Sequence, residues 1–239
     1  MPESARWKFD IQTEARVSGP ERLMTRGFID GEYQDGEIRG LVLVLGMRNM
    51  GKTTEACRLL TICTGGVFFF DTLSKHAHIF PDYKVFSESA PLLAYLRVNR
   101  GRRFHVLYQP RGGNLNQHFA DACKIAKAIG WMIFCVDEID KLCSPSYGDT
   151  RMPPELYDLV NYGRHYRVSM IATARRPKSV APGYRDEAEF RVFRLKADTA
   201  ESIRGDIGDE AAARVVTLDK YYYLRFLPDA DPELCGGPR

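Results

Sequence analysis

The sequence has no apolar run long enough to cross a membrane and no cysteine pattern typical of a disulfide or zinc protein. Its longest apolar runs, LVLVLG and VFFF, have the length of a strand, whereas a membrane-spanning helix needs about 20 residues. The N-terminus, MPESARWKFDIQTEAR, is charged and lacks the apolar segment of a signal peptide. The six cysteines form no CxxC pair, and several lie in apolar runs such as MIFCV, where a free thiol packs as a small hydrophobe. We therefore expect a soluble, cytoplasmic protein without a membrane span.

The composition shows no strong bias. The net charge of +3 is too small to indicate nucleic-acid binding by itself. The apolar fraction of 44% and the charged fraction of 27% match an ordinary globular protein, and the sequence has no internal repeat or low-complexity tract. A chain of 239 residues can form one α/β domain with a full core but is short for two. We expect one domain over residues 39–226, between an N-terminal extension, residues 1–38, and a C-terminal tail, residues 227–239.

Apolar segments of strand length alternate with helical segments along most of this domain. We expect strands at residues 41–46, 66–71, 104–109, 131–136, 168–173, 190–195 and 221–226. We expect helices at about residues 51–61, 90–97 and 117–129, and a further helix that starts at Pro153 or Pro154, where proline suits a first turn. Either Asn114 or Asn116 can cap the third of these helices. The alternation predicts an α/β fold with a mostly parallel sheet and helices on both faces.

The segment GMRNMGKT, from Gly46 to Thr53, matches the phosphate-loop pattern G-x-x-x-x-G-K-[ST] and lies between a buried strand and a helix. Gly46 and Gly51 let the backbone turn its amides inward, and the helix N-terminus favours an anion. Lys52 would reach the β- and γ-phosphates, the Thr53 hydroxyl would ligate Mg²⁺, and Thr54 would contact the α-phosphate side. A chance glycine turn would explain the two glycines but not GKTT. We predict the RecA-like P-loop NTPase fold and an ATP site formed by Gly46, Met47, Arg48, Asn49, Met50, Gly51, Lys52, Thr53 and Thr54.

Two acidic residues, Asp137 and Glu138, directly follow the apolar strand WMIFCV. In a doubly wound sheet this strand end lies on the same edge as the phosphate loop. Asp137 would hold Mg²⁺ through water or together with Thr53, and Glu138 would orient and polarise the attacking water. The alternative is a pair of solvated acids at a strand end. A catalytic Glu138 favours a hydrolase over a passive nucleotide switch.

Three further charged residues have two interpretations each. Asp140 and Lys141 follow the acidic pair and either take part in the site or begin a solvated helix. Asp71 ends the strand GVFFFD at the same sheet edge and either supports the site or has no role in it.

The segment YGRHYRVSMIATARRP combines a helix that ends in Gly-Arg-His, a strand, and a polar residue followed by Arg-Pro. It is similar to the FtsK/HerA superfamily of DNA-pumping ATPases, which includes the genome-packaging ATPases of tailless double-stranded DNA viruses. The resemblance covers about residues 39–200, although the first two motifs are common to all P-loop ATPases. In the superfamily a glutamine that senses the γ-phosphate usually precedes Arg-Pro. Here Arg175 takes that position, so the resemblance assigns the sensing to Arg175 or to Thr173.

The resemblance also implies a homo-oligomeric ring, a hexamer or a pentamer, with ATP bound between subunits. Such rings use an arginine from the neighbouring subunit at the phosphates. Arg164 and Arg167 are the first candidates, with Arg185 and Arg191 behind them. Each is otherwise an ordinary surface arginine.

The function that the resemblance implies is translocation of double-stranded DNA, most similar to viral genome packaging into a capsid with a capsid vertex protein as a further partner. DNA movement needs contacts with charge and backbone shape, for which the loops 111–114 and 141–151 are candidates. Both are otherwise simple surface connections. The aromatic runs VFFF and YYYLRF are interpreted as strand core. The alternatives are a filamentous-phage-type assembly ATPase, an ATP-dependent regulatory or assembly protein that does not move DNA, and a small-molecule kinase.

Overall fold

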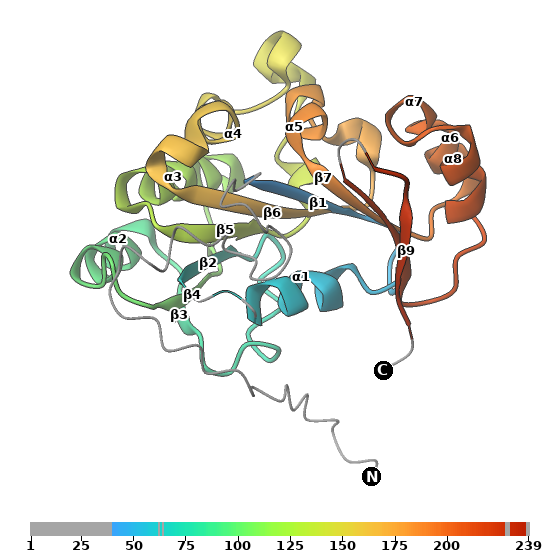
Figure 1. Cartoon of the computed structure of the whole chain (residues 1–239). Coiled ribbons are helices and arrows are strands. Elements are labelled where there is room, and N and C mark those ends of the chain that lie inside the picture. The colour runs from blue at the N-terminus through green and yellow to red at the C-terminus, as the bar shows by residue number, and fades with distance from the viewer. Residues whose placement is uncertain (1–39, 62, 64, 228–229, 238–239) are drawn as a thin grey trace.

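The structure, a computed structural model, describes residues 40–237 except 62, 64, 228 and 229. The N-terminal extension expected at residues 1–38 lies outside the described residues. The described chain forms a nine-stranded sheet with the order β3-β4-β2-β5-β6-β1-β7-β8-β9. Strands β1 to β7 are parallel, whereas β8 pairs antiparallel with both β7 and β9. The prediction of an α/β fold with a mostly parallel sheet is confirmed (Figure 1).

The central strands are continuous apolar runs because both faces of the sheet are covered. Two strands were not predicted. β3 has three residues at an edge of the sheet, too few to show a period, and β9 lies within the expected C-terminal tail, where its pairing with β8 makes it a strand. The strands are β1 Leu41–Leu45, β2 Gly66–Phe70, β3 Lys84–Phe86, β4 His105–Tyr108, β5 Met132–Val136, β6 Val168–Ala174, β7 Glu189–Phe193, β8 Tyr222–Phe226 and β9 Glu233–Gly236.

The longer helices lie where the sequence predicts them. Of the two candidate caps for α3, Asn114 takes the role, because its side chain accepts a hydrogen bond of 3.0 Å from the amide of Asn116. The last four helices, of four to seven residues each, were not predicted, since segments this short carry no helical period. The helices are α1 Lys52–Thr61, α2 Ser89–Val98, α3 Leu115–Ile129, α4 Pro154–Tyr166, α5 Pro182–Glu187, α6 Ala197–Glu201, α7 Arg204–Ile207 and α8 Asp209–Val215.

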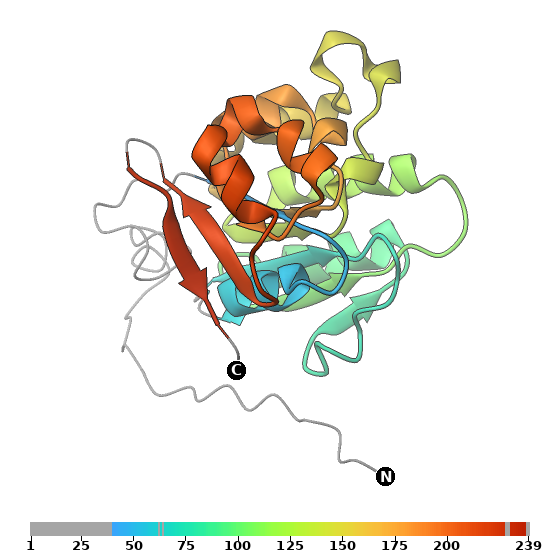
Figure 2. The same cartoon turned by 90° about the vertical axis from the view of Figure 1, so that its right-hand side faces the viewer.

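The sheet separates two apolar cores. Alternate residues of β1 face opposite sides: Leu43 packs into the core under α2 to α5, and Val44 packs into the core under α1. Figure 1 shows α1 alone on one face and α2, α3, α4 and α5 on the other. Figure 2 shows the β8 and β9 pair at the end of the sheet, beside α6, α7 and α8. No helix in the described part of the chain is both long and apolar enough to span a membrane.

The register of the parallel strands brings their carboxyl ends to one edge, here called the carboxyl edge. Leu45 of β1 is level with Ala174 of β6, and Val136 of β5 is level with Ala172 of the same strand. The residues that follow these three strands therefore lie side by side. The phosphate loop, the acidic pair and the Arg-Arg-Pro segment meet at this edge.

Candidate functional site

Both glycines of the phosphate loop are required by its geometry. Gly46 has φ 154° and Gly51 has φ 118°, which side chains rarely allow. A Cβ at Gly46 would lie 2.7 Å from Cβ of Phe193, and a Cβ at Gly51 would lie 2.9 Å from the rings of Phe193 and Tyr221. The loop thus packs its backbone directly against aromatic side chains of β7 and of the segment before β8.

Lys52 begins α1 and lies inside the loop that precedes it. Its side chain is buried, and Nζ donates a hydrogen bond of 2.9 Å to the carbonyl oxygen of Met47. Burial lowers the pKa of Lys52 to about 8, although the nearby carboxylate of Asp137 opposes the shift. An anion bound in the loop would stabilise the charged form of this ammonium group.

A cavity of about 280 Å³ opens at the loop. Predicted phosphate ligands and two residues that the sequence analysis did not assign line it together. Its lining consists of Asn49, Gly51, Lys52, Thr53, Thr54, Lys220 and Tyr221. Lys220 and Tyr221 were missed because their segment, just before β8, is more than 160 residues away along the chain and its aromatic run is typical of strand core.

Thr173 of β6 links the two acidic residues that follow β5. Its hydroxyl donates a hydrogen bond of 2.8 Å to Oδ1 of Asp137 and accepts one of 3.0 Å from the amide of Glu138. All three residues are buried. The contact fixes the acidic pair to the neighbouring strand.

Glu138 is held by two cations. Its Oε1 is 2.5 Å from Nη2 of Arg175, and its other oxygen pairs with Lys141. Burial alone would raise the pKa of Glu138, but the hydrogen bonds and charges of Lys141 and Arg175 outweigh it and lower the pKa below its usual value. Asp140 accepts a hydrogen bond of 3.2 Å from the amide of Arg176 and so holds the Arg-Arg-Pro segment against the same turn.

A buried polar network supports Asp137 from the side of β2. Nδ1 of His76 is 2.8 Å from Oδ1 of Asp71 and 3.9 Å from Oδ2 of Asp137. Gln109 donates a hydrogen bond of 2.8 Å to the other oxygen of Asp71. Asp71 thus lies beside the site, as its strand-end position allowed. His76 and Gln109 were missed because no motif marks them.

The donors at this edge fit a magnesium ion. Burial raises the pKa of Asp137, while the charge of His76 and the hydrogen bond from Thr173 oppose the shift. A divalent cation would favour the ionised form of this carboxylate. The hydroxyl of Thr53 and a carboxylate oxygen are hard donors of the kind that Mg²⁺ prefers.

The structure separates the arginine candidates for a contact between subunits. Arg164 and Arg167 are exposed at the end of α4, next to the first residue of β6, and so lie at the opposite edge of the sheet from the phosphate loop. The guanidinium of Arg167 stacks 3.8 Å from the ring centre of Trp131. Arg185 forms an ion pair with Asp206 of its own chain.

Arg191 requires a correction. Its side chain is 0% exposed, so it cannot reach a neighbouring subunit, and its prediction as a surface or intersubunit arginine is wrong. The guanidinium pairs with Glu55 of α1 and, at 2.8 Å, with Glu189 of β7, while the hydroxyl of Tyr223 donates a hydrogen bond of 3.0 Å to Glu55. In a sequence, charged residues at alternate positions of a strand are typical of an exposed face. Ion pairs with residues far away in the chain, which allow such residues to be buried, cannot be recognised from the sequence. The network ties the phosphate-loop helix to β7 and β8.

Comparisons with known proteins show the fold. No family model matches the chain, and no curated protein does. Among solved structures, the genome packaging NTPase B204 from Sulfolobus turreted icosahedral virus 2 in complex with AMPPCP has a TM-score of 0.66 and 16% identity, covering 84% of this chain and 98% of that chain. Its complex with ATP-gammaS has a TM-score of 0.65 and 16% identity, covering 83% and 97%. B204, the DNA-packaging ATPase from Sulfolobus turreted icosahedral virus, has a TM-score of 0.62 and 16% identity, covering 84% and 98%. The chain therefore has the P-loop NTPase fold of these packaging enzymes, which confirms the predicted fold class and, at the level of the fold, the predicted likeness to viral packaging ATPases.

Proposed function

We propose that the chain is an ATP-hydrolysing motor that translocates double-stranded DNA and packages a viral genome into a preformed capsid. The observation that carries the proposal is the meeting of the phosphate loop, the acidic pair Asp137 and Glu138, and Arg175 at one edge of the sheet. The likeness of the fold to B204, which is described as a DNA-packaging ATPase, supports the part of the proposal that concerns DNA.

In the proposed reaction the backbone amides of the phosphate loop and the ammonium group of Lys52 bind the phosphates of ATP. Thr53 and Asp137 would hold Mg²⁺, which would supply positive charge to neutralise the phosphates. Glu138 accepts a hydrogen bond from the attacking water and orients it toward the γ-phosphate. The two hydrogen bonds of Thr173 hold Asp137 and Glu138 in fixed positions relative to each other.

The ion pair between Arg175 and Glu138 suggests how hydrolysis is linked to nucleotide binding. A carboxylate held by two cations is a weaker proton acceptor than a free one. The γ-phosphate carries more negative charge than Glu138 and competes for the guanidinium of Arg175. ATP binding therefore draws Arg175 to the phosphate and leaves Lys141 as the partner of one oxygen of Glu138, so that the other oxygen can polarise water.

The ring that we propose places Arg164 or Arg167 of one subunit at the ATP of the next. Within one chain these exposed side chains and the phosphate loop lie at opposite edges of the sheet, so only a neighbouring copy can bring them together. Arg185 would first have to leave its ion pair with Asp206.

DNA contacts are proposed for the two loops at the carboxyl edge. Residues 111–114 follow β4 and are all exposed, and the loop 141–151 follows the acidic pair. Arg111 and Arg151 are cations suited to phosphate contacts that do not depend on base sequence. Because both loops follow strands of the same edge, movement at the ATP site can reach them directly.

A triplex-displacement assay tests translocation. A linear duplex carries a third strand bound at one position, and the protein is added at low salt with ATP and Mg²⁺. We expect the wild-type chain to release the third strand and the Glu138→Gln variant, which should bind ATP without rapid turnover, to leave it in place. If the wild-type chain hydrolyses ATP in the presence of this DNA but releases no third strand, the translocase proposal is wrong and an assembly or regulatory ATPase is the better description.

A further inference from the structure

The strand order fixes the direction in which a nucleotide must lie. Asp137 and Glu138 follow β5, which lies on one side of β1, separated from it only by β6. Strands β7 and β8 lie on the other side of β1. If the γ-phosphate is at the acidic pair, as the proposed function requires, the α-phosphate, ribose and base lie on the side of β7 and β8.

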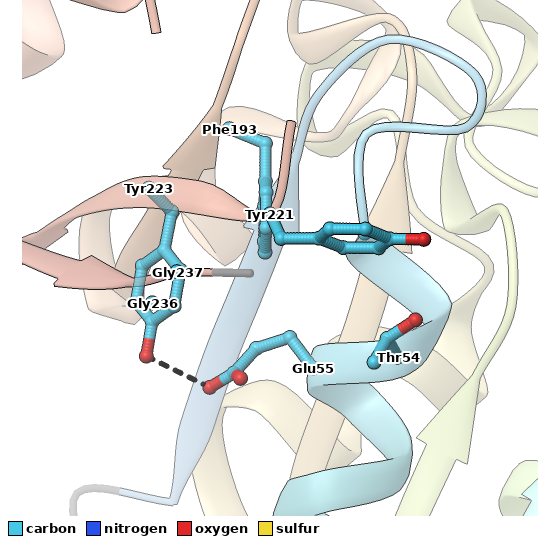
Figure 3. A pocket seen from close by; sticks show the side chains of 8 residues that line it. Thr54, Glu55, Phe193, Tyr221, Tyr223, Gly236 and Gly237 are labelled. Carbon is cyan, nitrogen blue, oxygen red and sulfur yellow. Dashed lines mark hydrogen bonds between the residues drawn. The ribbon is translucent and has the colours of Figure 1, made fainter. Parts of the chain in front are cut away.

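Tyr221 occupies this side of the phosphate loop. It lines the cavity of about 280 Å³ at the loop, and it also lines a smaller cavity of about 60 Å³ between α1 and the β8 and β9 pair. The two cavities share Gly51, Thr54 and Tyr221. Figure 3 shows the ring of Tyr221 extending over Thr54, the residue predicted at the α-phosphate side. A ligand that leaves the phosphate cavity on this side meets the aromatic ring first.

The backbone holds Tyr221 against the loop. Its amide donates a hydrogen bond of 3.0 Å to the carbonyl oxygen of Met50, and its own carbonyl oxygen accepts one of 3.2 Å from the amide of Gly237. Its φ of 71° is an unfavourable conformation for a bulky side chain, and such conformations persist where the surroundings enforce them. The ring is therefore placed by the phosphate loop and by the β9 end, not by the regular geometry of β8, which begins one residue later.

The chemistry around the ring suits a neutral aromatic group. Glu55, the acidic residue of the smaller cavity, is already paired with Arg58 and Arg191, and it accepts the hydrogen bond of Tyr223. The described lining of the smaller cavity therefore offers no unpaired cation that could bind a phosphate. The exposed ammonium group of Lys220 is 4.7 Å from the ring centre of Tyr221 and also lines the phosphate cavity, so a base that stacks on the same face of the ring would displace it.

We propose that Tyr221 is the base-stacking residue of this site and holds the nucleobase of the bound nucleoside triphosphate beside Thr54. The inference rests on the proposed function, because it assumes a triphosphate in the loop. Stacking on an aromatic side chain contributes to affinity with little dependence on the identity of the base, because every base has a π-face.

Calorimetric titrations with two probes separate this inference from the proposed function. The probes are the non-hydrolysable β,γ-methylene analogue of ATP and inorganic tripolyphosphate, each with Mg²⁺. Removing the ring in Tyr221→Ala should weaken binding of the analogue about 10- to 100-fold and leave binding of tripolyphosphate unchanged. Tyr221→Phe should bind both probes as the wild-type chain does. Tyr157→Ala, which removes an exposed tyrosine of α4, is the matched control and should change neither affinity.

Each contrary result has a distinct meaning. If Tyr221→Ala binds the analogue as tightly as the wild-type chain, or loses both probes equally because the ring only supports Gly51, the stacking role is wrong. If the wild-type chain binds neither probe, the proposed function itself is wrong.

Should Tyr221→Ala not fold, Tyr221→Trp gives an independent test, because stacking predicts that the analogue quenches the added indole fluorescence while tripolyphosphate does not. Equal quenching by both probes, or none, would overturn the proposal.

Discussion

Replacing Lys52 with alanine is expected to lower ATP turnover by about 1,000-fold or more. Lys52 is buried within the phosphate loop, where its Nζ donates a hydrogen bond to Met47, and the proposed function puts the β- and γ-phosphates at this group. Lys220, the other lysine of the cavity, is exposed and lies over the ring of Tyr221, so it lacks the buried position of Lys52 within the loop. The ammonium charge acts in a desolvated position, where it stabilises phosphate charge more strongly than in water.

Phosphate release from ATP measures this effect. The matched control is Lys124→Ala, which removes an exposed lysine of α3 and should leave turnover unchanged. Retention of near wild-type turnover in Lys52→Ala would mean that the phosphate loop is not the hydrolytic site.

Replacing Glu138 with glutamine should leave ATP binding close to wild type but slow hydrolysis by about 100- to 10,000-fold. Glutamine has nearly the same shape and keeps hydrogen-bonding capacity, but it cannot accept a proton from water. Single-turnover phosphate release with the variant in excess over ATP isolates the chemical step from product release. Binding of the non-hydrolysable analogue to the same preparation shows whether the site is intact.

The result also tests whether Glu138 has a purely structural role. If its function is only to hold Arg175 and Lys141 in place, the variant should lose thermal stability while its rate of hydrolysis stays near wild type. Glu155→Gln, at a partly exposed ion pair of α4, is the control for loss of an acidic charge. A Glu138→Gln variant that hydrolyses ATP as fast as this control would contradict a catalytic role.

The fold could be predicted from the sequence wherever burial alone decides the residues of a strand. The run LVLVL becomes β1 because both faces of that strand are covered by apolar cores. Strands at the ends of the sheet gave no such signal: β3 is largely exposed, and β9 depends on pairing with β8. Local patterns predict buried elements well, whereas edge strands depend on their partners.

The residues of the candidate site also fall into two classes, those that local patterns predict and those that depend on tertiary packing. The phosphate loop and the acidic pair are local motifs and were found without the structure. His76 and Tyr221 reach the site through tertiary packing, and no pattern in their own segments marks them. Arg191 is an error of the opposite kind. This charged residue was assigned to the surface, whereas its ion pairs in the folded chain allow it to be buried.

The measurement that tests the central claim most directly is the rate of ATP hydrolysis as a function of protein concentration, with and without linear duplex DNA at low salt. A site shared between the subunits of a DNA-translocating ring predicts a rate per chain that rises cooperatively with protein concentration and rises further with DNA. A rate per chain that is independent of both concentration and DNA would contradict the account, because it would show a hydrolytic site that is complete in one chain and not coupled to DNA.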